Sequence, residues 1–247
     1  MANIRDILPL LNAVAPFEMA EEWDNVGLLA GNPDAEVKRI LCALDLNLDV
    51  IARAKEISAQ LIVTHHPILF RGRKNLREDD PEGKLLCALI RSGVGLIAMH
   101  TNFDAAHPGV NDALAQALSL QNVCGLPCGL CAGDLEKTET LHSFEKCVET
   151  ALGDAVRVYG SEDKRIRRVA VMGGSGGDYV KYALEMGADA FVTGEIGYHK
   201  ALDAAALGLC IFEAGHGATE KPAISLLCSA LQKQINAVQY EICVDSI

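Results

Sequence analysis

KRILCALDLNLDVIARAKEISAQLIVTHH, residues 38–66, carries the strongest fold signal in this chain, because a similar stretch occurs a second time. The second copy is IRRVAVMGGSGGDYVKYALEMGADAFVTGE, residues 166–195. The two copies align without a gap at a shift of 129 positions, which is 178 − 49 for the matched pair Asp49 and Asp178. We infer that the chain contains an internal duplication.

Each copy has the pattern of a strand, a helix and a second strand. The expected elements are residues 40–44, about 48–58 and 61–64 in the first copy, and 169–172, about 177–186 and 190–193 in the second. Strands that alternate with helices form mainly parallel sheets, because a parallel connection needs a crossover of a dozen or more residues. The sequence therefore predicts an α/β fold with two related domains.

The duplication also suggests how the chain divides. We expect an N-terminal α/β domain over residues 1–125 and a C-terminal α/β domain over residues 126–247. Residues 121–135 hold several glycines and a proline, so they are the expected linker, and a helix over about 140–152 follows. The polar residues 71–83 are an expected surface insertion in the first copy.

Composition argues against several classes of protein. The net charge of −11 argues against a general nucleic-acid surface, which needs clustered lysine and arginine. The sequence contains no run of about 18 apolar residues, so we expect no membrane-spanning helix. Residues 1–11 lack the pattern of a signal peptide, and the nine cysteines then indicate reduced thiols, so we expect a cytoplasmic protein.

A histidine pair follows the second strand of the first copy. His65 and His66 stand at the expected carboxyl end of that strand, where ligands gather in parallel sheets, and Pro67 favours an extended segment. Adjacent side chains of an extended segment face opposite sides, so the two histidines would bind two different ions. The alternative is a pair of surface or capping histidines.

A second donor pair, His216 and Glu220, stands near the end of the last expected strand. Thr219 is the expected N-cap of a helix over about 220–233. Both side chains would then point toward one crevice. The alternative is that Glu220 only complements the dipole of the helix.

The segment MHTNFDAAHPGVND, residues 99–112, supplies a third group. Asp104 is its best oxygen ligand, His100 is either a ligand or a residue that orients substrate or water, and His107 is expected to be exposed. Imidazole and carboxylate ligands together suit zinc, iron, manganese or nickel and are poor for calcium. Three histidines and two acids suffice for two ions if one carboxylate bridges them.

Two further motifs leave alternatives open. The glycine-rich run at residues 173–177 is either a phosphate-binding turn before a helix or a tight strand–helix turn. Cys124, Cys128 and Cys131 have the spacing of a three-cysteine iron–sulfur motif, but they stand in the expected linker. A cluster or a zinc knuckle there is the less favoured interpretation.

Six motifs occur in a fixed order over about residues 23–220: WDNVGLLAG, IVTHHPILF, MHTNFDAAHPGVND, VAVMGGSGGDYV, ADAFVTGEIGYH and EAGHGATE. Together they resemble the YbgI-type (NIF-three-like) dinuclear metal family, many of whose members are labelled GTP cyclohydrolase I type 2 homologs. The resemblance implies two interlocked α/β domains, a metal site in the cleft between them, and a toroidal homohexamer. It covers nearly the whole chain, although Cys131 stands where many members have an arginine.

The resemblance also implies a ligand set. By motif match, one ion would be held by His65 and His216 and the other by His66 and Asp104, with Glu220 bridging both. Three further residues, His100, Glu195 and His199, match motif positions that line the same cleft. With Thr64, they are the candidates for orienting substrate and moving protons.

The sequence thus predicts a metal-dependent hydrolase that binds two divalent ions per chain. The family label suggests GTP as substrate, with attack on the imidazole ring of the purine and release of formate. One alternative is a metal-dependent phosphohydrolase that acts on a nucleotide or another small phosphorylated molecule. The other is a non-enzymatic ring protein that binds metal or serves a regulatory role.

Overall fold

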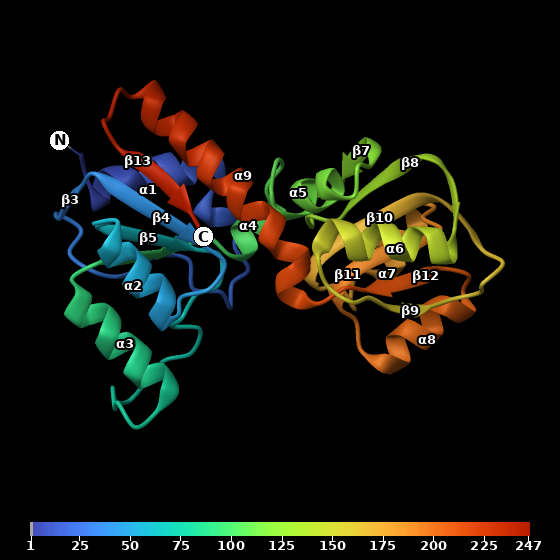
Figure 1. Cartoon of the computed structure of the whole chain (residues 1–247), viewed down its shortest axis with the longest axis horizontal. Helices are drawn as coiled ribbons and strands as arrows, with labels where there is room; N and C mark the ends of the chain where they lie inside the picture. Colours follow the sequence, from blue (N-terminus) through green and yellow to red (C-terminus); the bar gives the residue numbers. More distant parts are fainter. Residues whose placement is uncertain (1) are drawn as a thin grey trace. The chain divides into compact units, whose positions relative to one another are not determined.

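The two copies of the repeated stretch form the centres of two sheets, in two units of the chain (Figure 1). The computed structural model describes residues 2–247. Unit 1 consists of residues 2–106 and 224–247, and unit 2 consists of residues 107–223. The predicted α/β fold class is confirmed, because each unit has a sheet with parallel central strands and helices between them.

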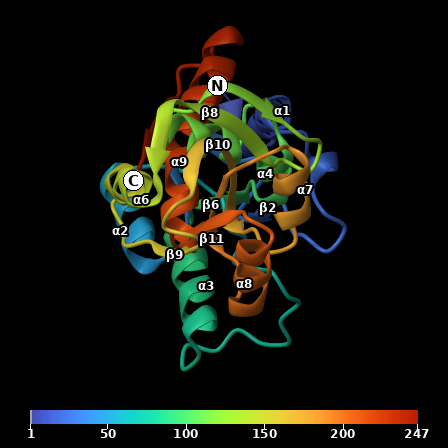
Figure 2. The ribbon, with the colours of Figure 1, turned by 90° about the vertical axis from the view of Figure 1, so that its right-hand side faces the viewer.

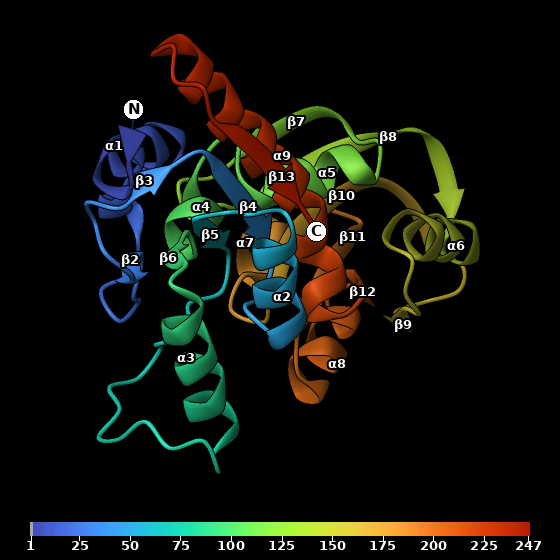
Figure 3. The same cartoon turned by 60° about the vertical axis from the view of Figure 1, so that its left-hand side comes forward.

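Unit 1 is built around a sheet with the strand order β13-β4-β5-β6-β2, in which β2 alone runs antiparallel to its neighbour. Its elements are β1 (Ala2–Asn3), α1 (Ile4–Val14), η1 (Phe17–Met19), β2 (Gly27–Ala30), β3 (Glu36–Val37), β4 (Arg39–Ala43), α2 (Leu48–Glu56), β5 (Leu61–Thr64), α3 (Pro81–Ser92), β6 (Gly95–Ala98), α4 (Thr101–Ala105), the end of α9 (His216–Ala237) and β13 (Cys243–Ser246). Leu41, Ile62 and Leu96 on the strands form one buried cluster with residues of α2 and α3. These two helices therefore cover one face of the sheet, and Figure 3 shows α2 beside the strands.

Unit 2 has the strand order β7-β8-β10-β11-β12-β9, with β10, β11 and β12 parallel and the outer strands antiparallel. Its elements are α5 (Val110–Ala117), β7 (Gln121–Gly125), β8 (Cys131–Thr140), α6 (Leu141–Leu152), β9 (Arg157–Tyr159), β10 (Arg165–Ser175), α7 (Val180–Glu185), β11 (Ala190–Glu195), α8 (Tyr198–Ala206), β12 (Cys210–Glu213) and the start of α9. Val169 and Val171 pack with α5 and α6, whereas Ala170 and Met172 pack with α7 and α8. The sheet is thus covered on both faces, as Figure 2 shows for α6 and α8.

Strand register supports the internal duplication. Ile40 pairs with Leu61 in unit 1, and Val169 pairs with Ala190 in unit 2, both in parallel strands. Both partners are shifted by the same 129 positions, since 169 − 40 and 190 − 61 give that number. The two copies therefore form the same strand–helix–strand unit, down to the residue pairs of the ladder.

Local sequence explains where several helices begin and end. The side chain of Asn47 accepts a hydrogen bond from Val50 N at the start of α2, and Thr140 does the same for Ser143 N at the start of α6. Helix α6 ends at Gly153, which has the left-handed conformation common after a helix. The helices expected over about 48–58 and about 140–152 are confirmed.

The region expected as a linker is instead a hairpin. β7 pairs with β8, and β8 pairs with the central strand β10, so both belong to the sheet of unit 2. The linker prediction is therefore wrong, and the expected boundary at residues 125/126 falls inside unit 2. Unit 1 also includes the C-terminal residues of the chain, because β13 pairs with β4.

The predicted surface insertion at residues 71–83 is confirmed only in part: its last three residues are helical, whereas residues 71–80 contain no helix or strand and are mostly exposed. Helix α3 begins directly after them, at Pro81. Within residues 2–247, no helix is both long enough and apolar enough to cross a membrane.

Candidate metal centre

Three histidines of unit 1 follow two adjacent parallel strands. His65 and His66 follow β5, and His100 follows β6. One ring nitrogen of each histidine lies within 4.8 Å of those of the other two. The ring centroids of His65 and His66 are 4.9 Å apart, because the chain bends after β5. The expectation that these two side chains face opposite sides is therefore wrong.

Each of the three imidazoles has an acceptor at its Nδ1 atom. The acceptors, each at 2.8 Å, are the carbonyl oxygen of Met99 for His65, the carboxylate of Asp45 for His66 and the carboxylate of Asp24 for His100. When Nδ1–H donates, the lone pair of a neutral imidazole is on Nε2, and metal-binding histidines are commonly held in this way. All three side chains therefore have the orientation of metal ligands.

Asp104 adds a carboxylate to this group. It lies on the short helix α4, and its Oδ1 atom is 3.6 Å from Nε2 of His65. The side chain of His65 is 1% exposed and that of Asp104 is 24% exposed, so solvent reaches this pair on the side of Asp104. Unit 1 thus brings together four of the predicted site residues.

Asp24 is a residue of this site that the sequence analysis did not single out. Its fully buried carboxylate accepts hydrogen bonds from Nδ1 of His100 and from both the backbone N–H and the hydroxyl of Thr101. Burial alone would raise the pKa of Asp24, but these hydrogen bonds lower it well below its ordinary value of 3.8. Asp24 is therefore ionised at neutral pH and holds the His100 ring in place.

Asp45 was also missed, although a signal for it was present. It follows β4 just as His65 follows β5, so the rule that selected polar residues at strand ends applies to it equally. The signal for Asp24 was weaker, because it is only one residue of the WDNVGLLAG motif and no strand ends there.

A second group of donors lies in unit 2. His216 is the first residue of α9, and its Nε2 atom is 3.2 Å from Oε1 of Glu220, one turn later. Its Nδ1 atom is 3.7 Å from Oε1 of Glu195, which ends β11. The helix begins earlier than expected, so Thr219 lies inside it and is not its N-cap. Its hydroxyl donates to the carbonyl oxygen of His216 at 2.8 Å.

The glycine-rich run allows β10 to approach these donors. A Cβ atom at Gly174, where φ is +62°, would lie 2.4 Å from Oε1 of Glu220 and 3.3 Å from the His216 ring. A Cβ atom at Gly176 would lie 2.2 Å from the hydroxyl of Thr193. Helix α7 has only six residues and begins later, at Val180. The glycines are therefore explained by close packing, which favours the tight turn over the phosphate-binding turn.

The remaining candidates for catalysis have different surroundings. Thr64 is buried, and its hydroxyl donates to the carbonyl oxygen of His66 at 2.9 Å, so it shapes the bend after β5. Glu195 is 62% exposed and accepts a hydrogen bond from the hydroxyl of Ser175 at 3.4 Å. His199 is exposed on α8, with its ring centroid 5.3 Å from that of Tyr198.

A hollow of about 680 Å³ lies beside the histidines of unit 1. Trp23 and Phe70 line it, and their rings stand edge-on to His100 with centroids 6.2 and 6.3 Å away. Both aromatic side chains are solvent-exposed. Arg71 and Lys74 also line the hollow, and in the described part of the chain neither has a carboxylate within 4.0 Å. The hollow therefore has aromatic and cationic walls.

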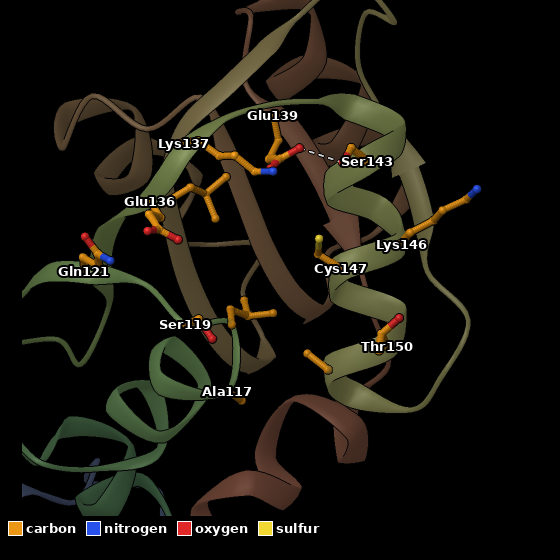
Figure 4. A pocket seen from close by; sticks show the side chains of 13 residues that line it. Ala117, Ser119, Gln121, Glu136, Lys137, Glu139, Ser143, Lys146, Cys147 and Thr150 are labelled. Atoms are coloured by element: carbon orange, nitrogen blue, oxygen red, sulfur yellow. Dashed lines mark hydrogen bonds and ion pairs between the residues drawn. The ribbon is translucent and has the colours of Figure 1, made fainter.

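A second hollow, of about 650 Å³, lies in unit 2 between β8 and α6 (Figure 4). Lys137, Glu139 and Lys146 stand around it, and Ser143 donates a hydrogen bond to Glu139 at 2.7 Å. None of the predicted site residues lines it. It is therefore separate from both donor groups.

The chemistry of the donors fits metal ions. Both groups offer imidazole nitrogens and carboxylate oxygens and contain no sulfur. Such ligands suit zinc, iron, manganese and nickel. The structure therefore contains His and Glu groups that could hold metal ions.

The chain is similar over its whole described length to one family of proteins. The family model Duf34/NIF3 (NGG1p interacting factor 3) matches residues 2–247. A protein of Clostridium acetobutylicum named GTP cyclohydrolase 1 type 2 homolog is 32% identical over 240 residues, which cover 93% of this chain and 90% of the relative.

Solved structures show the same likeness. A hypothetical protein of Staphylococcus aureus has a TM-score of 0.95 and 31% identity, over 99% of this chain and 96% of that chain. The protein ybgI shares the fold, with a TM-score of 0.85 and 24% identity, over 100% of this chain and 98% of its own. The predicted resemblance is confirmed, and the chain belongs to the Duf34/NIF3 family.

Proposed function

We propose that the chain is a metal-dependent hydrolase that binds two divalent ions. The ligands would be His65, His66, Asp104, His216 and Glu220, with Glu220 shared by both ions. The observation that supports this most is the convergence of three imidazoles in unit 1, each with its Nδ1 atom held by an acceptor. The proposed ions are zinc, iron, manganese or nickel.

When bound, two such ions would polarise the electrophilic atom of a substrate and lower the pKa of a water molecule. The residues of the chain would orient the substrate and move protons. Asp24 keeps the Nδ1–H of His100 in a 2.8 Å hydrogen bond, so Nε2 of His100 is suited to accept a proton. Glu195 and His199 are the further residues that we propose to contact the substrate.

The hollow beside His100 suggests the class of substrate. Its volume of about 680 Å³ is in the usual range for sites that bind small molecules. Trp23 and Phe70 can contact a flat ring, and Arg71 and Lys74 can attract an anion. We therefore propose a nucleotide or another small phosphorylated molecule, and the name of the relatives makes GTP the first candidate.

The experiment that tests this proposal is a turnover assay with the purified, metal-loaded protein. GTP, cyclic nucleotides and simple phosphoesters are assayed for the wild type, for Glu220→Ala and for the control His142→Ala. His142 is 71% exposed on α6, where its ring pairs with Glu145. We expect turnover in the wild type and the control, and a loss of turnover in Glu220→Ala and after metal removal.

The competing function is that of a non-enzymatic metal-binding or regulatory protein. It would be favoured if the wild type held two ions per chain and yet turned over none of these substrates. A phosphohydrolase would be favoured if the phosphoesters reacted and the purine ring of GTP stayed intact.

We also propose that the chain assembles as a toroidal homohexamer. Six chains of 26.4 kDa have a mass of about 158 kDa. Light scattering behind a size-exclusion column measures this mass directly, and a mass of one or two chains would contradict the hexamer.

A further inference from the structure

A separate cluster of possible ligands lies in unit 2. His107 precedes α5, Asp112 is in the first turn of that helix, and Cys131 begins β8. One ligand atom of each lies within 4.8 Å of those of the other two. None of these residues belongs to the donor groups described above.

The hydrogen bonds of His107 show how the cluster is arranged. Its Nδ1 atom is 2.9 Å from Oδ2 of Asp112 and 4.0 Å from Sγ of Cys131, so both partners approach the same ring nitrogen. In a Cys-His-Asp proton relay, the thiol and the carboxylate would contact opposite nitrogens of the imidazole. The arrangement therefore argues against a nucleophilic cysteine and suits ligands that share one cation.

The other side of the His107 ring is fixed by the protein. Its Nε2 atom donates to the carbonyl oxygen of Leu126 at 3.2 Å, which is how metal-binding histidines are usually oriented. The ring also packs closely against β7, since a Cβ atom at Gly125 would lie 2.3 Å from its Cε1 atom. Oδ2 of Asp112 accepts a second hydrogen bond, from Gly109 N at 2.9 Å. These contacts therefore hold both side chains in place.

The three side chains differ in their solvent exposure. Cys131 is buried, whereas the side chains of His107 and Asp112 are 36% and 30% exposed. An ion could therefore reach the cluster from solvent and meet the thiol on its inner side.

We propose that His107 Nδ1, the Asp112 carboxylate and the Cys131 thiolate form a zinc-binding site. Thiolate, imidazole and carboxylate are the usual ligands of zinc, and a water molecule would complete four-coordination. On binding, the Cys131 thiol and the protonated His107 ring would each release a proton to solvent, and the His107–Asp112 hydrogen bond would be replaced.

The other two cysteines of the motif do not contribute to this site. Sγ of Cys124 is 3.6 Å from the carbonyl oxygen of Ala132 and accepts from the Arg168 guanidinium at 3.3 Å. Cys128 packs against the core cluster on the face of the sheet opposite to that of Cys131. The spacing of the three cysteines therefore reflects no shared cluster, and Cys131 alone has ligand partners.

Cobalt(II) is a probe that separates this site from the proposed hydrolase site. Thiolate ligation gives cobalt(II) a near-ultraviolet sulfur-to-metal absorption band, and the proposed hydrolase ligands contain no sulfur. The metal-free full chain is titrated with cobalt(II), and zinc is then added to compete. We expect a band that disappears with zinc in the wild type and in His65→Ala/His66→Ala alike, and that saturates near one equivalent in the variant.

Variants identify the ligands. Cys131→Ser should abolish the band, and His107→Ala should abolish it or weaken cobalt(II) binding at least about tenfold, as ligand losses usually do. Cys124→Ser and Cys128→Ser are the matched controls and should keep it. His107 is partly exposed, so its variant should fold, and circular dichroism checks this. The proposal is overturned if the wild type gives no band, if the band survives in Cys131→Ser, or if either control loses it.

Discussion

Asp24 accepts the Nδ1 hydrogen of His100 at 2.8 Å, although 76 residues separate the two along the chain. This bond links the N-terminal WDN motif to the histidines that follow the central strands. It also fixes which nitrogen of His100 faces the proposed metal centre. A fixed geometry of this kind is needed if His100 orients substrate or accepts a proton.

Replacing the carboxylate of this pair should therefore impair turnover. We expect Asp24→Asn to lower activity about 10- to 100-fold, in the range typical for residues that orient metal-site histidines. Asp34→Asn is the control, because Asp34 is 63% exposed and pairs with Arg5. Steady-state kinetics measures the effect, and equal activity of the two variants would show that Asp24 has no such role.

Gly174 offers a test of the unit 2 donors. Gly174→Ala should cost about 1–2 kcal/mol of stability because of its positive φ, and its Cβ atom should also displace Glu220. The control is Gly187→Ala, since Gly187 has φ +71° and nothing within 4 Å of the added Cβ. Both variants should unfold at lower denaturant concentration, but only Gly174→Ala should lose metal affinity. A similar loss in both would assign the effect to the backbone.

The His107–Asp112 pair should make stability depend on pH in the metal-free chain. Burial alone would lower the pKa of His107, but hydrogen bonds to Asp112 and to the Leu126 carbonyl raise it above 6.5. A histidine whose folded pKa is raised stabilises the protein fully below its unfolded pKa, and this stabilisation disappears as pH rises through the folded pKa.

His107→Gln should therefore destabilise the metal-free protein near pH 6. The expected loss is only about 0.2–1 kcal/mol, because the His107–Asp112 pair is partly exposed. Near pH 9 the difference from the wild type should be smaller. Urea unfolding at both pH values measures this difference in the free energy of unfolding. A destabilisation by His107→Gln that grows with pH would contradict the raised pKa of His107.

The cationic wall of the hollow beside His100 should act on substrate binding. We expect Arg71→Ala/Lys74→Ala to raise KM about tenfold, equivalent to about 1.4 kcal/mol, with little change in kcat. Lys181→Ala removes an exposed lysine of α7 and should leave KM unchanged. If kcat fell instead and KM stayed constant, the two cations would not serve substrate binding.

Sequence predicted the parts of the site that depend on periodicity. Apolar runs located β5 and β12, and the rule that ligands gather at strand ends selected His65, His66 and His216. The expected start of a helix near residue 220 also pointed Glu220 toward the same crevice as His216, and in the structure the two residues lie one turn apart on α9.

Features that depend on contacts between distant residues were not predicted. The glycines near residues 125–133 suggested a linker, but they belong to the strands and the turn of the β7–β8 hairpin, and β8 pairs with β10. Thr219 as an N-cap suggested a helix starting near residue 220, whereas α9 begins at His216 and contains both Thr219 and Pro222. The bonds of Asp24 and Asp45 to histidines arise only from tertiary packing, so spacing along the chain could not show them.

The metal content of the chain is the decisive measurement for the proposed dinuclear site. Elemental analysis is made on Cys131→Ser, which removes the proposed zinc site, and on the same chain carrying His65→Ala/His66→Ala. We predict about two ions per chain in the first protein, as a dinuclear site requires, and well under one in the second. A content well below one ion in the first protein, unchanged in the second, would rule out the proposed dinuclear site.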